Sequence, residues 1–475
     1  MKLTPMNLVA GVDCSTQGTK VVVCDAETGV VQREARVSHP DVTELDPEVW
    51  WSAWSEASRG ILEDVTALAV GGQQHGMVLL DEDGTPVRDA LLWNDNRSAS
   101  AAVDLTAELG GPTAWATATG LVPVASFTVT KLRWVAEHEP STAARASQVL
   151  LPHDYLTHRL RAGSGDPTTD RGDASGTGYW STVDGYRPDL LRLAFGRDLA
   201  TPRVAESHEA VGRTRDGILI APGTGDNMAA ALGLGLEHGD IAVSLGTSGT
   251  VFAVADKPTH DESGIVAGFA DATGRFLPLV CTLNAARVLQ AATTLARADL
   301  SELDELALSV DDSDGLVLLP FLDGERTPPL PDARGLLHGL TRHNATPGHL
   351  VRAAVDGMLC GLADAVEAIR GIGIEPRRIV LIGGAARSRA VQLVAGGMFD
   401  LPVWVPNPAE YVALGAARQA AWTVSGEPDP PTWELDGRTV LPGEPYVDAG
   451  RRARERYRHV LGSARDLLDA EGNPG

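Results

Sequence analysis

The sequence predicts an α/β protein of two domains that are built on one plan. The chain has 475 residues, whereas a single hydrophobic core usually stops growing at about 250–300 residues. A β-hairpin with a turn of small polar residues is expected near residue 16 and again near residue 247, and strands alternate with helices between them. Such a duplication indicates two similar halves. We place the boundary near residue 235, which gives expected domains of residues 1–235 and 236–475.

The first half opens with short apolar runs that are separated by polar turns, a pattern typical of strands. We expect these strands at Leu8–Asp13, Lys20–Asp25, Val30–Val37, Ala67–Val70 and, as a neighbour of the last, Met77–Leu80. A helix is expected to begin at Asp46-Pro47, because Asp suits the N-cap and Pro the first helical position. Its apolar face contains Trp50, Trp54, Ala57 and Ile61. This Trp-rich face is expected to belong to the core.

The rest of the chain, on both sides of the expected boundary, continues the alternation of strands and helices. Strands are expected at Ile218–Ala221, Ile241–Ser244, Thr250–Val254, Arg378–Ile382 and Pro402–Val405. Helices are expected from Met228 to about Leu236, from Ser388 to about Phe399 and at Val412–Trp422. The tail from Ala449 to about Ala470 is an amphipathic helix, with Tyr457, Val460, Leu461, Ala464 and Leu468 on one side.

Composition excludes several classes of function. The formal net charge of −23 and the pI near 4.9 disfavour a nucleic-acid or anionic-membrane partner, because phosphates would be repelled. The four cysteines are scattered without metal-ligand spacing. No apolar run reaches the ~18 residues that a membrane span needs, and the N-terminus does not resemble a signal peptide. We therefore expect a soluble cytoplasmic protein.

Two turns are suited to phosphate binding. The first is Gly11-Val12-Asp13-Cys14-Ser15-Thr16-Gln17-Gly18-Thr19-Lys20, and the second is Ser244-Leu245-Gly246-Thr247-Ser248-Gly249-Thr250. Small residues let backbone N–H groups converge on phosphate oxygens, an acid such as Asp13 can hold Mg²⁺, and Lys20 can meet phosphate charge. Either turn alone is more often an ordinary hairpin turn, and neither is a Walker A loop.

Two further segments could carry chemistry. Asp226, in Gly223-Thr224-Gly225-Asp226-Asn227, lies where a strand passes into a helix, so the helix N-terminus should favour its ionised form. The alternative is that Asp226 is only an N-cap. Gly383 and Gly384 follow an apolar strand and would let an adenine or ribose lie against backbone, although close helix–strand packing explains them equally well.

The order of these motifs resembles the FGGY carbohydrate kinases over nearly the whole chain, and within them the xylulokinases. The similarity includes Asp46-Pro47-Glu48-Val49-Trp50-Trp51, Gly72-Gln73-Gln74-His75-Gly76, Leu92-Trp93-Asn94-Asp95, Leu150-Leu151-Pro152-His153-Asp154-Tyr155-Leu156, Ser175-Gly176-Thr177, Leu319-Pro320-Phe321-Leu322-Asp323-Gly324-Glu325-Arg326-Thr327-Pro328, Leu381-Ile382-Gly383-Gly384-Ala385-Ala386-Arg387-Ser388 and Ala413-Leu414-Gly415-Ala416-Ala417-Arg418. It implies two actin-like ATPase (ribonuclease H-like) domains with a catalytic cleft between them.

The resemblance also implies roles for individual residues in the ATP-dependent phosphorylation of D-xylulose. Asp226 would accept the proton of the sugar hydroxyl, and Asp13 would organise Mg²⁺. The sugar would be bound by Gln74, His75, Trp93, Asp226 and Asn227. ATP would be bound by Thr16, Gln17, Lys20, Gly246, Thr247, Gly383, Gly384 and Ser388. The chain departs from the family pattern at Ser15, where Gly is common, and at Gln74, where Met is frequent.

Phosphoryl transfer has a loose transition state, so alignment and charge neutralisation supply most of the catalysis. An ionised Asp226 is a weak base, but it suffices because the hydroxyl becomes acidic only as it bonds to phosphorus. The alternative substrates within the family are L-ribulose, gluconate and glycerol. A heat-shock-type ATPase would need a peptide-binding domain, and a sugar-sensing regulator is disfavoured by the intact motifs. The sequence leaves open whether the protein forms a homodimer.

Overall fold

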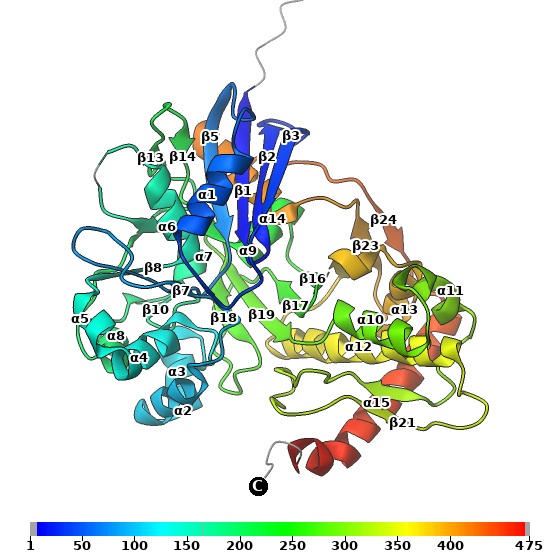
Figure 1. Cartoon of the computed structure of the whole chain (residues 1–475). Coiled ribbons are helices and arrows are strands. Elements are labelled where there is room, and N and C mark those ends of the chain that lie inside the picture. Colours follow the sequence, from blue (N-terminus) through cyan, green and yellow to red (C-terminus); the bar gives the residue numbers. More distant parts are fainter. Residues whose placement is uncertain (1–6, 164, 471–475) are drawn as a thin grey trace, which may run out of the picture. The chain divides into compact units, whose positions relative to one another are not determined.

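The computed structural model describes residues 7–163 and 165–470 of the chain, which fold into two compact units (Figure 1). Unit 1 contains the chain up to Leu236 together with Ala255–Pro278 and Ala409–Glu434. Unit 2 contains Glu237–Val254, Leu279–Pro408 and the chain from Leu435 onward. Two segments that follow residue 235 in the sequence therefore belong to unit 1, so a single boundary near residue 235 does not separate the two units. The assignment of sugar and nucleotide sites to residues 1–235 and 236–475 stays a prediction.

The main sheet of unit 1 has the strand order β13-β14-β5-β1-β2-β3, and β15 also pairs with β5. Its strands are β1 (Leu8–Ser15), β2 (Gly18–Asp25), β3 (Val31–Ser38), β5 (Val65–Gly72), β13 (Gly212–Arg213), β14 (Leu219–Ile220) and β15 (Thr224–Gly225). β1 is antiparallel to β2 and parallel to β5. The expected hairpin near residue 16 is therefore confirmed.

The sheet of unit 2 repeats this plan. Its strands are β16 (Asp240–Leu245), β17 (Gly249–Ala253), β19 (Phe276–Thr282), β22 (Arg378–Ile382), β23 (Val403–Pro406) and β24 (Gly437–Val440). The order β23-β22-β16-β17-β19 corresponds to β14-β5-β1-β2-β3 of unit 1. The directions also correspond, because β16 is antiparallel to β17 and parallel to β22. The predicted duplication is confirmed.

Helices cover these sheets, and the remaining strands are short. The helices are α1 (Glu48–Ala57), α2 (Ala99–Glu108), α3 (Pro112–Thr119), α4 (Thr128–His138), α5 (Pro140–Arg145), α6 (Pro152–Leu160), α7 (Arg171–Ala174), α8 (Pro188–Phe195), α9 (Asp226–Leu234), α10 (Ala286–Leu295), α11 (Leu303–Leu308), α12 (Pro347–Gly371), α13 (Arg389–Phe399), α14 (Tyr411–Ser425) and α15 (Glu444–Ala470). The short strands are β4 (Glu44–Leu45), β6 (Val78–Leu80), β7 (Ala90–Leu91), β8 (Gln148–Leu150), β9 (Thr168–Thr169), β10 (Trp180–Ser181), β11 (Gly185–Tyr186), β12 (Arg203–Val204), β18 (Ala267–Ala270), β20 (Val317–Leu319) and β21 (Leu336–His338).

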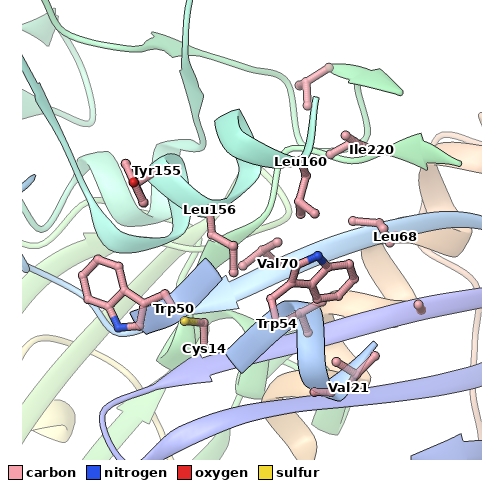
Figure 2. Close-up of a cluster of buried hydrophobic side chains, with 14 of the residues drawn as sticks. Cys14, Val21, Trp50, Trp54, Leu68, Val70, Tyr155, Leu156, Leu160 and Ile220 are labelled. Atoms are coloured by element: carbon pink, nitrogen blue, oxygen red, sulfur yellow. The ribbon is translucent and has the colours of Figure 1, made fainter. Parts of the chain in front are cut away.

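One face of the unit 1 sheet is packed by α1 and α6. Trp50 and Trp54 of α1 are buried in a cluster that includes Cys14, Val70 and Leu156, as Figure 2 shows. Burying an aromatic ring of this size removes about 150–250 Å² of surface from water. The expectation that the Trp-rich face belongs to the core is confirmed, although the helix begins one residue later than predicted, with Pro47 at the N-cap.

The other face of this sheet is packed by α14, which also lies against α9. Both contacts are close because the facing residues are small. A Cβ atom at Gly11 of β1 would lie 1.8 Å from the carbonyl oxygen of Ala413, and one at Gly415 would lie 1.8 Å from that of Ala229. The Ala/Gly-rich helix after Asp226 therefore approaches its neighbours closely.

Two other predictions had different outcomes. Met77–Leu80 was expected to neighbour the strand at residues 67–70, but β6 pairs with β8 and β5 pairs with β1, β14 and β15. The length and composition of a strand do not identify the strand with which it pairs. The local pattern therefore predicted the strand at residues 77–80 but not its partner. The amphipathic tail helix is confirmed as α15, which begins at Glu444 rather than at Ala449, with Tyr457, Val460 and Leu468 buried. Across residues 7–163 and 165–470, no helix combines the length and apolarity needed to cross a bilayer.

Candidate active site

Three neighbouring parallel strands of unit 1 bring the predicted sugar and phosphate residues to one edge of the sheet. Asp13 of β1 lies opposite Gly71 of β5, and Thr224 of β15 pairs with the same residue. The segments after β5 and β15 carry Gln74 and Asp226. Because the carboxyl ends of parallel strands share an edge, where open α/β sheets bind their ligands, residues far apart in sequence converge here.

Asp13 is buried beside a cation. Its Oδ2 lies 3.3 Å from Nζ of Lys20, and the same Nζ lies 2.6 Å from Oε2 of Glu410. Burial raises the pKa of Asp13, and the charge of Lys20 opposes that rise. Oδ1 of Asp13 is buried and has no hydrogen-bond partner among the described residues. An unpartnered carboxylate oxygen suits a hard cation such as Mg²⁺, which takes oxygen ligands.

The turn between β1 and β2 carries Thr16 and Gln17. Oγ1 of Thr16 accepts a hydrogen bond of 2.7 Å from Nε1 of Trp93. Gln17 is exposed, and its carbonyl accepts from the backbone N–H of His39 at 2.9 Å. The structure therefore brings Trp93, which was predicted in the sugar site, to Thr16, which was predicted in the ATP site.

A short chain of hydrogen bonds links Gln74, Asn227 and Asp226. Nδ2 of Asn227 donates to Oε1 of Gln74 at 3.1 Å and to Oδ1 of Asp226 at 2.9 Å. The side chain of Gln74 is 3% exposed, and its Nε2 has no partner within the described part of the chain. This buried N–H group can donate to an acceptor atom of a ligand, and leaving it unpaired costs about 1–3 kcal/mol. Three predicted sugar residues thus lie together.

The proton affinity of Asp226 differs from the expectation. Asp226 is the first residue of α9, and the N-cap is Gly225, so the N-cap alternative is wrong. Burial raises the pKa of Asp226 to about 7, and the carboxylates of Asp13 and Asp173 add to this rise, whereas backbone N–H groups oppose it. The predicted dominance of the helix N-terminus is therefore incorrect, because desolvation and like charges outweigh it. The side chain is better suited to accept a proton than an ordinary carboxylate.

His75 is held in an unusual backbone conformation. Its φ is 66°, in the left-handed region that favours glycine. Nδ1 lies 2.8 Å from the carbonyl oxygen of Gly176, so this nitrogen carries the proton. The ring centroid lies 4.9 Å from that of Phe127 and 5.5 Å from that of Phe269. These contacts fix both the tautomer and the orientation of the imidazole.

The predicted ATP residues of the second half lie in unit 2. Gly246 and Thr247 form the turn between β16 and β17, and their carbonyls accept hydrogen bonds from the N–H groups of Ala286 and Ala285. Gly383 has φ of 93°, and a Cβ there would lie 2.6 Å from the carbonyl carbon of Leu245. Backbone packing thus requires Gly383.

The next two predicted positions of unit 2 differ in their surroundings. A Cβ at Gly384 would meet open space, as expected for a shelf that a ligand could approach. Ser388 is the N-cap of α13: its Oγ accepts from the N–H of Val391 and donates to Asp304. The Ser388 hydroxyl is therefore used within the protein.

Sequence reasoning missed several residues around the site. Glu410 forms an ion pair with Lys20. The sequence feature that could have indicated Glu410 is its position just before the motif at residues 413–418. Phe127 and Phe269 flank His75 without any motif of their own. His153 and Asp173 lie behind the site, and only His153 stood in a quoted motif.

Comparison with known proteins gives this geometry a family. Residues 8–233 match the N-terminal domain of the FGGY family of carbohydrate kinases, and residues 241–424 match its C-terminal domain. The chain belongs to the FGGY family of carbohydrate kinases. Curated relatives are a xylulose kinase of Streptomyces rubiginosus, 46% identical with 97% of each chain covered, and one of Streptomyces coelicolor, 45% identical with 98% of each chain covered.

Among solved structures, a xylulose kinase from Bifidobacterium adolescentis is 41% identical, with a TM-score of 0.86 over 95% of this chain and all of that one. The predicted two-domain α/β fold of actin-like sugar kinases is confirmed, as is the prediction of a sugar kinase. The matches to both FGGY kinase domains support a kinase over the two alternatives considered from the sequence, a heat-shock-type ATPase and a sugar-sensing regulator.

Proposed function

We propose that this FGGY kinase transfers the γ-phosphoryl group of ATP to O5 of D-xylulose, giving D-xylulose 5-phosphate and ADP. The observation that carries the proposal is the hydrogen-bonded chain Gln74–Asn227–Asp226, which ends on a carboxylate of raised pKa. The relatives named above as xylulose kinases support this sugar. L-Ribulose, gluconate and glycerol are the alternative acceptors, and we infer a cytoplasmic enzyme whose assembly could be a homodimer.

The sugar would lie against Gln74, His75, Trp93 and Asn227, with its terminal hydroxyl at Asp226. The buried Nε2 of Gln74 can donate to a sugar oxygen, and the fixed ring of His75 presents one edge to the ketose. A site built to hydrogen-bond hydroxyls discriminates strongly against analogues that lack them. This arrangement favours a polyhydroxylated ketose over glycerol, which offers fewer hydroxyls.

The predicted ATP-binding residues come from both halves of the duplicated plan. Thr16, Gln17 and Lys20 would contact phosphate oxygens from unit 1. Gly246, Thr247, Gly383, Gly384 and Ser388 would form the nucleotide side in unit 2. Asp13 would hold Mg²⁺, which neutralises charge on the β- and γ-phosphate oxygens when bound. The orphaned Oδ1 of Asp13 supports this assignment.

Asp226 would orient the O5 hydroxyl and take its proton as the new O–P bond forms. A base works best when its pKa lies near the working pH, and burial raises the pKa of Asp226 to about 7. Around neutral pH the carboxylate is partly ionised and has appreciable proton affinity. This is a stronger base than an aspartate with an ordinary pKa near 3.9.

D-Xylulose should give the highest kcat/KM in a panel with L-ribulose, D-ribulose, gluconate and glycerol. The measurement is a coupled ADP-release assay with MgATP, in which each acceptor is compared with an acceptor-free control. If glycerol, gluconate or L-ribulose gave the highest kcat/KM, D-xylulose would not be the preferred substrate, and the family assignment would stand. A sugar-independent release of ADP would count against phosphoryl transfer to any of these acceptors.

Replacing His75 with Ala should raise the KM for D-xylulose or lower kcat, with little change in the KM for ATP. The reason is that the ring contacts the sugar in our proposal, whereas all its assigned contacts lie in unit 1. Ala also strains the left-handed backbone at φ 66°, so His75→Gly is the matched control without that strain. Both variants should lose sugar affinity. Normal sugar kinetics in His75→Gly would assign the effect of His75→Ala to the backbone.

A further inference from the structure

A buried ionic cluster lies behind the edge that carries Gln74 and Asp226. It consists of His153 and Asp154, at the start of α6, and Asp173 of α7, with all three side chains fully buried. Nδ1 of His153 lies 2.6 Å from Oδ2 of Asp173, and Nε2 lies 3.4 Å from Oδ1 of Asp154. The imidazole therefore faces a carboxylate with each ring nitrogen.

Such a position favours the charged imidazolium. Burial lowers the pKa of His153, but the carboxylates of Asp154, Asp173 and Asp170 outweigh it and raise the pKa to about 9. The three side chains also have the spacing of a metal site. Nδ1 is already taken by its 2.6 Å hydrogen bond to Asp173, and Nε2 lies 3.4 Å from Asp154, so each ring nitrogen is paired with a carboxylate. We therefore treat the cluster as an ion pair.

His153 touches both segments that carry the predicted sugar residues. A Cβ at Gly72, just before Gln73-Gln74, would lie 2.8 Å from Cβ of His153. A Cβ at Gly223, just before Thr224, would lie 2.7 Å from Cδ2 of the His153 ring. Cβ of His153 thus packs against the strand that leads to Gln74, and the His153 ring packs against the segment that leads to Asp226. Small displacements there matter, because a misplacement of about 1 Å can cost about 10² in rate.

A second contact joins the cluster to Asp226. Asp170 accepts hydrogen bonds from the N–H groups of Gly172 and Asp173, at 2.9 Å each, and from Oγ1 of Thr224 at 2.7 Å. Thr224 is separated from Asp226 by Gly225 alone. The α7 segment, to which His153 is bonded, is therefore tied to the strand that leads into Asp226.

Several charges bear on Asp226. Asp13 from β1 and Asp173 from α7 raise its pKa, and Lys20 and Glu410 act on Asp13. The residues that pair between β5 and β15, Gly71 with Thr224 and Gly72 with Gly225, carry no charge. Tyr179 and Tyr186 lie near the carboxylates of the cluster, and both stay neutral because burial raises the pKa of each phenol. Asp173 is thus the carboxylate through which His153 can act on the base.

We propose that His153 is a positioning residue for phosphoryl transfer: its buried imidazolium binds Asp154 and Asp173, fixes the backbone that carries Gln74 and Asp226, and offsets the charge of Asp173 next to the base. The proposal rests on Asp226 being the base of the proposed function. Without the imidazolium, the negative charge of Asp173 is no longer offset, so it raises the pKa of Asp226 and favours the protonated form. Loss of the Asp173 carboxylate has the opposite effect.

The test compares the pH profiles of kcat/KM for the wild-type enzyme, His153→Gln and Asp173→Asn, with saturating MgATP. Activity requires ionised Asp226, so the wild-type profile should rise with pH through an acidic limb. His153→Gln should move this limb to higher pH by about one unit, which lowers kcat/KM about tenfold on the limb and little on the plateau. Asp173→Asn should move it to lower pH, and the double variant should restore it towards the wild-type position.

Opposite shifts in the two single variants would support the role of His153. An equal loss of rate at every pH, or a loss of melting temperature with an unmoved limb, would reduce His153 to a structural residue. A wild-type profile without an acidic limb would instead count against Asp226 as the base. Nitrogen-15 NMR of histidine-labelled wild-type protein supplies a second readout, in which the His153 signals are those that His153→Gln lacks: at pH 7 both ring nitrogens of His153 should be protonated, and a neutral ring would overturn the proposal.

Discussion

Asp226→Asn should lower kcat by about 10²–10⁴, the usual contribution of a positioned acid–base group. Asn keeps the size and the hydrogen bonds of the side chain but cannot take the proton of the sugar hydroxyl. The fold should remain, because Asp226 is not the N-cap of α9 and a first-turn acid contributes only about 0.3–1 kcal/mol. The measurements are steady-state turnover of D-xylulose, the melting temperature and MgATP affinity.

A matched control is Asp46→Asn. Asp46 is also an acid at the start of a helix, and its Oδ1 accepts from the N–H of Glu48 at 2.9 Å, but it is exposed and outside the site. This variant should keep full turnover. If Asp226→Asn turned over at the wild-type rate as well, proton transfer to Asp226 would have no place in the mechanism. A parallel loss of stability and MgATP binding would indicate a structural role.

Much of the fold could be predicted because its signals are local. The hairpins β1–β2 and β16–β17 were recognisable from apolar runs around turns of small polar residues, and their repetition indicated the common plan. Pairing between distant segments has no comparable local signal. The sequence therefore did not reveal that β6 pairs with β8, or that Ala409–Glu434 packs with unit 1.

The site shows the same limit in its electrostatics. Asp13, Gln74 and Asp226 lay in motifs, so their convergence at one edge of the sheet could be anticipated. The proton affinity of Asp226 could not, because it depends on burial and on Asp173, which is 53 positions away in sequence. Glu410 escaped notice for a related reason: its role comes from a contact with Lys20 across 390 positions of chain.

We expect both stability and turnover to depend strongly on the close contact between α9 and α14. A Cβ at Gly415 would lie 1.8 Å from the oxygen and 2.6 Å from the carbon of the Ala229 carbonyl. Both are backbone atoms, so Gly415→Ala must push α9 away from α14. We expect a loss of about 3 kcal/mol in the free energy of unfolding, the upper range for overpacking. The displaced α9 carries Asp226, so the folded fraction should also lose kcat by about 10².

Gly462→Ala in α15 is the matched control, because a Cβ there would meet open space. Ala is the better helix former by about 0.8–1 kcal/mol in a helix interior, so this variant should be as stable as the wild type or slightly more so, with unchanged kcat. Denaturant unfolding and the coupled assay on both variants separate the two effects. If Gly415→Ala matched its control in stability and kcat, the spacing of α9 and α14 would not be what places Asp226 at the sugar hydroxyl.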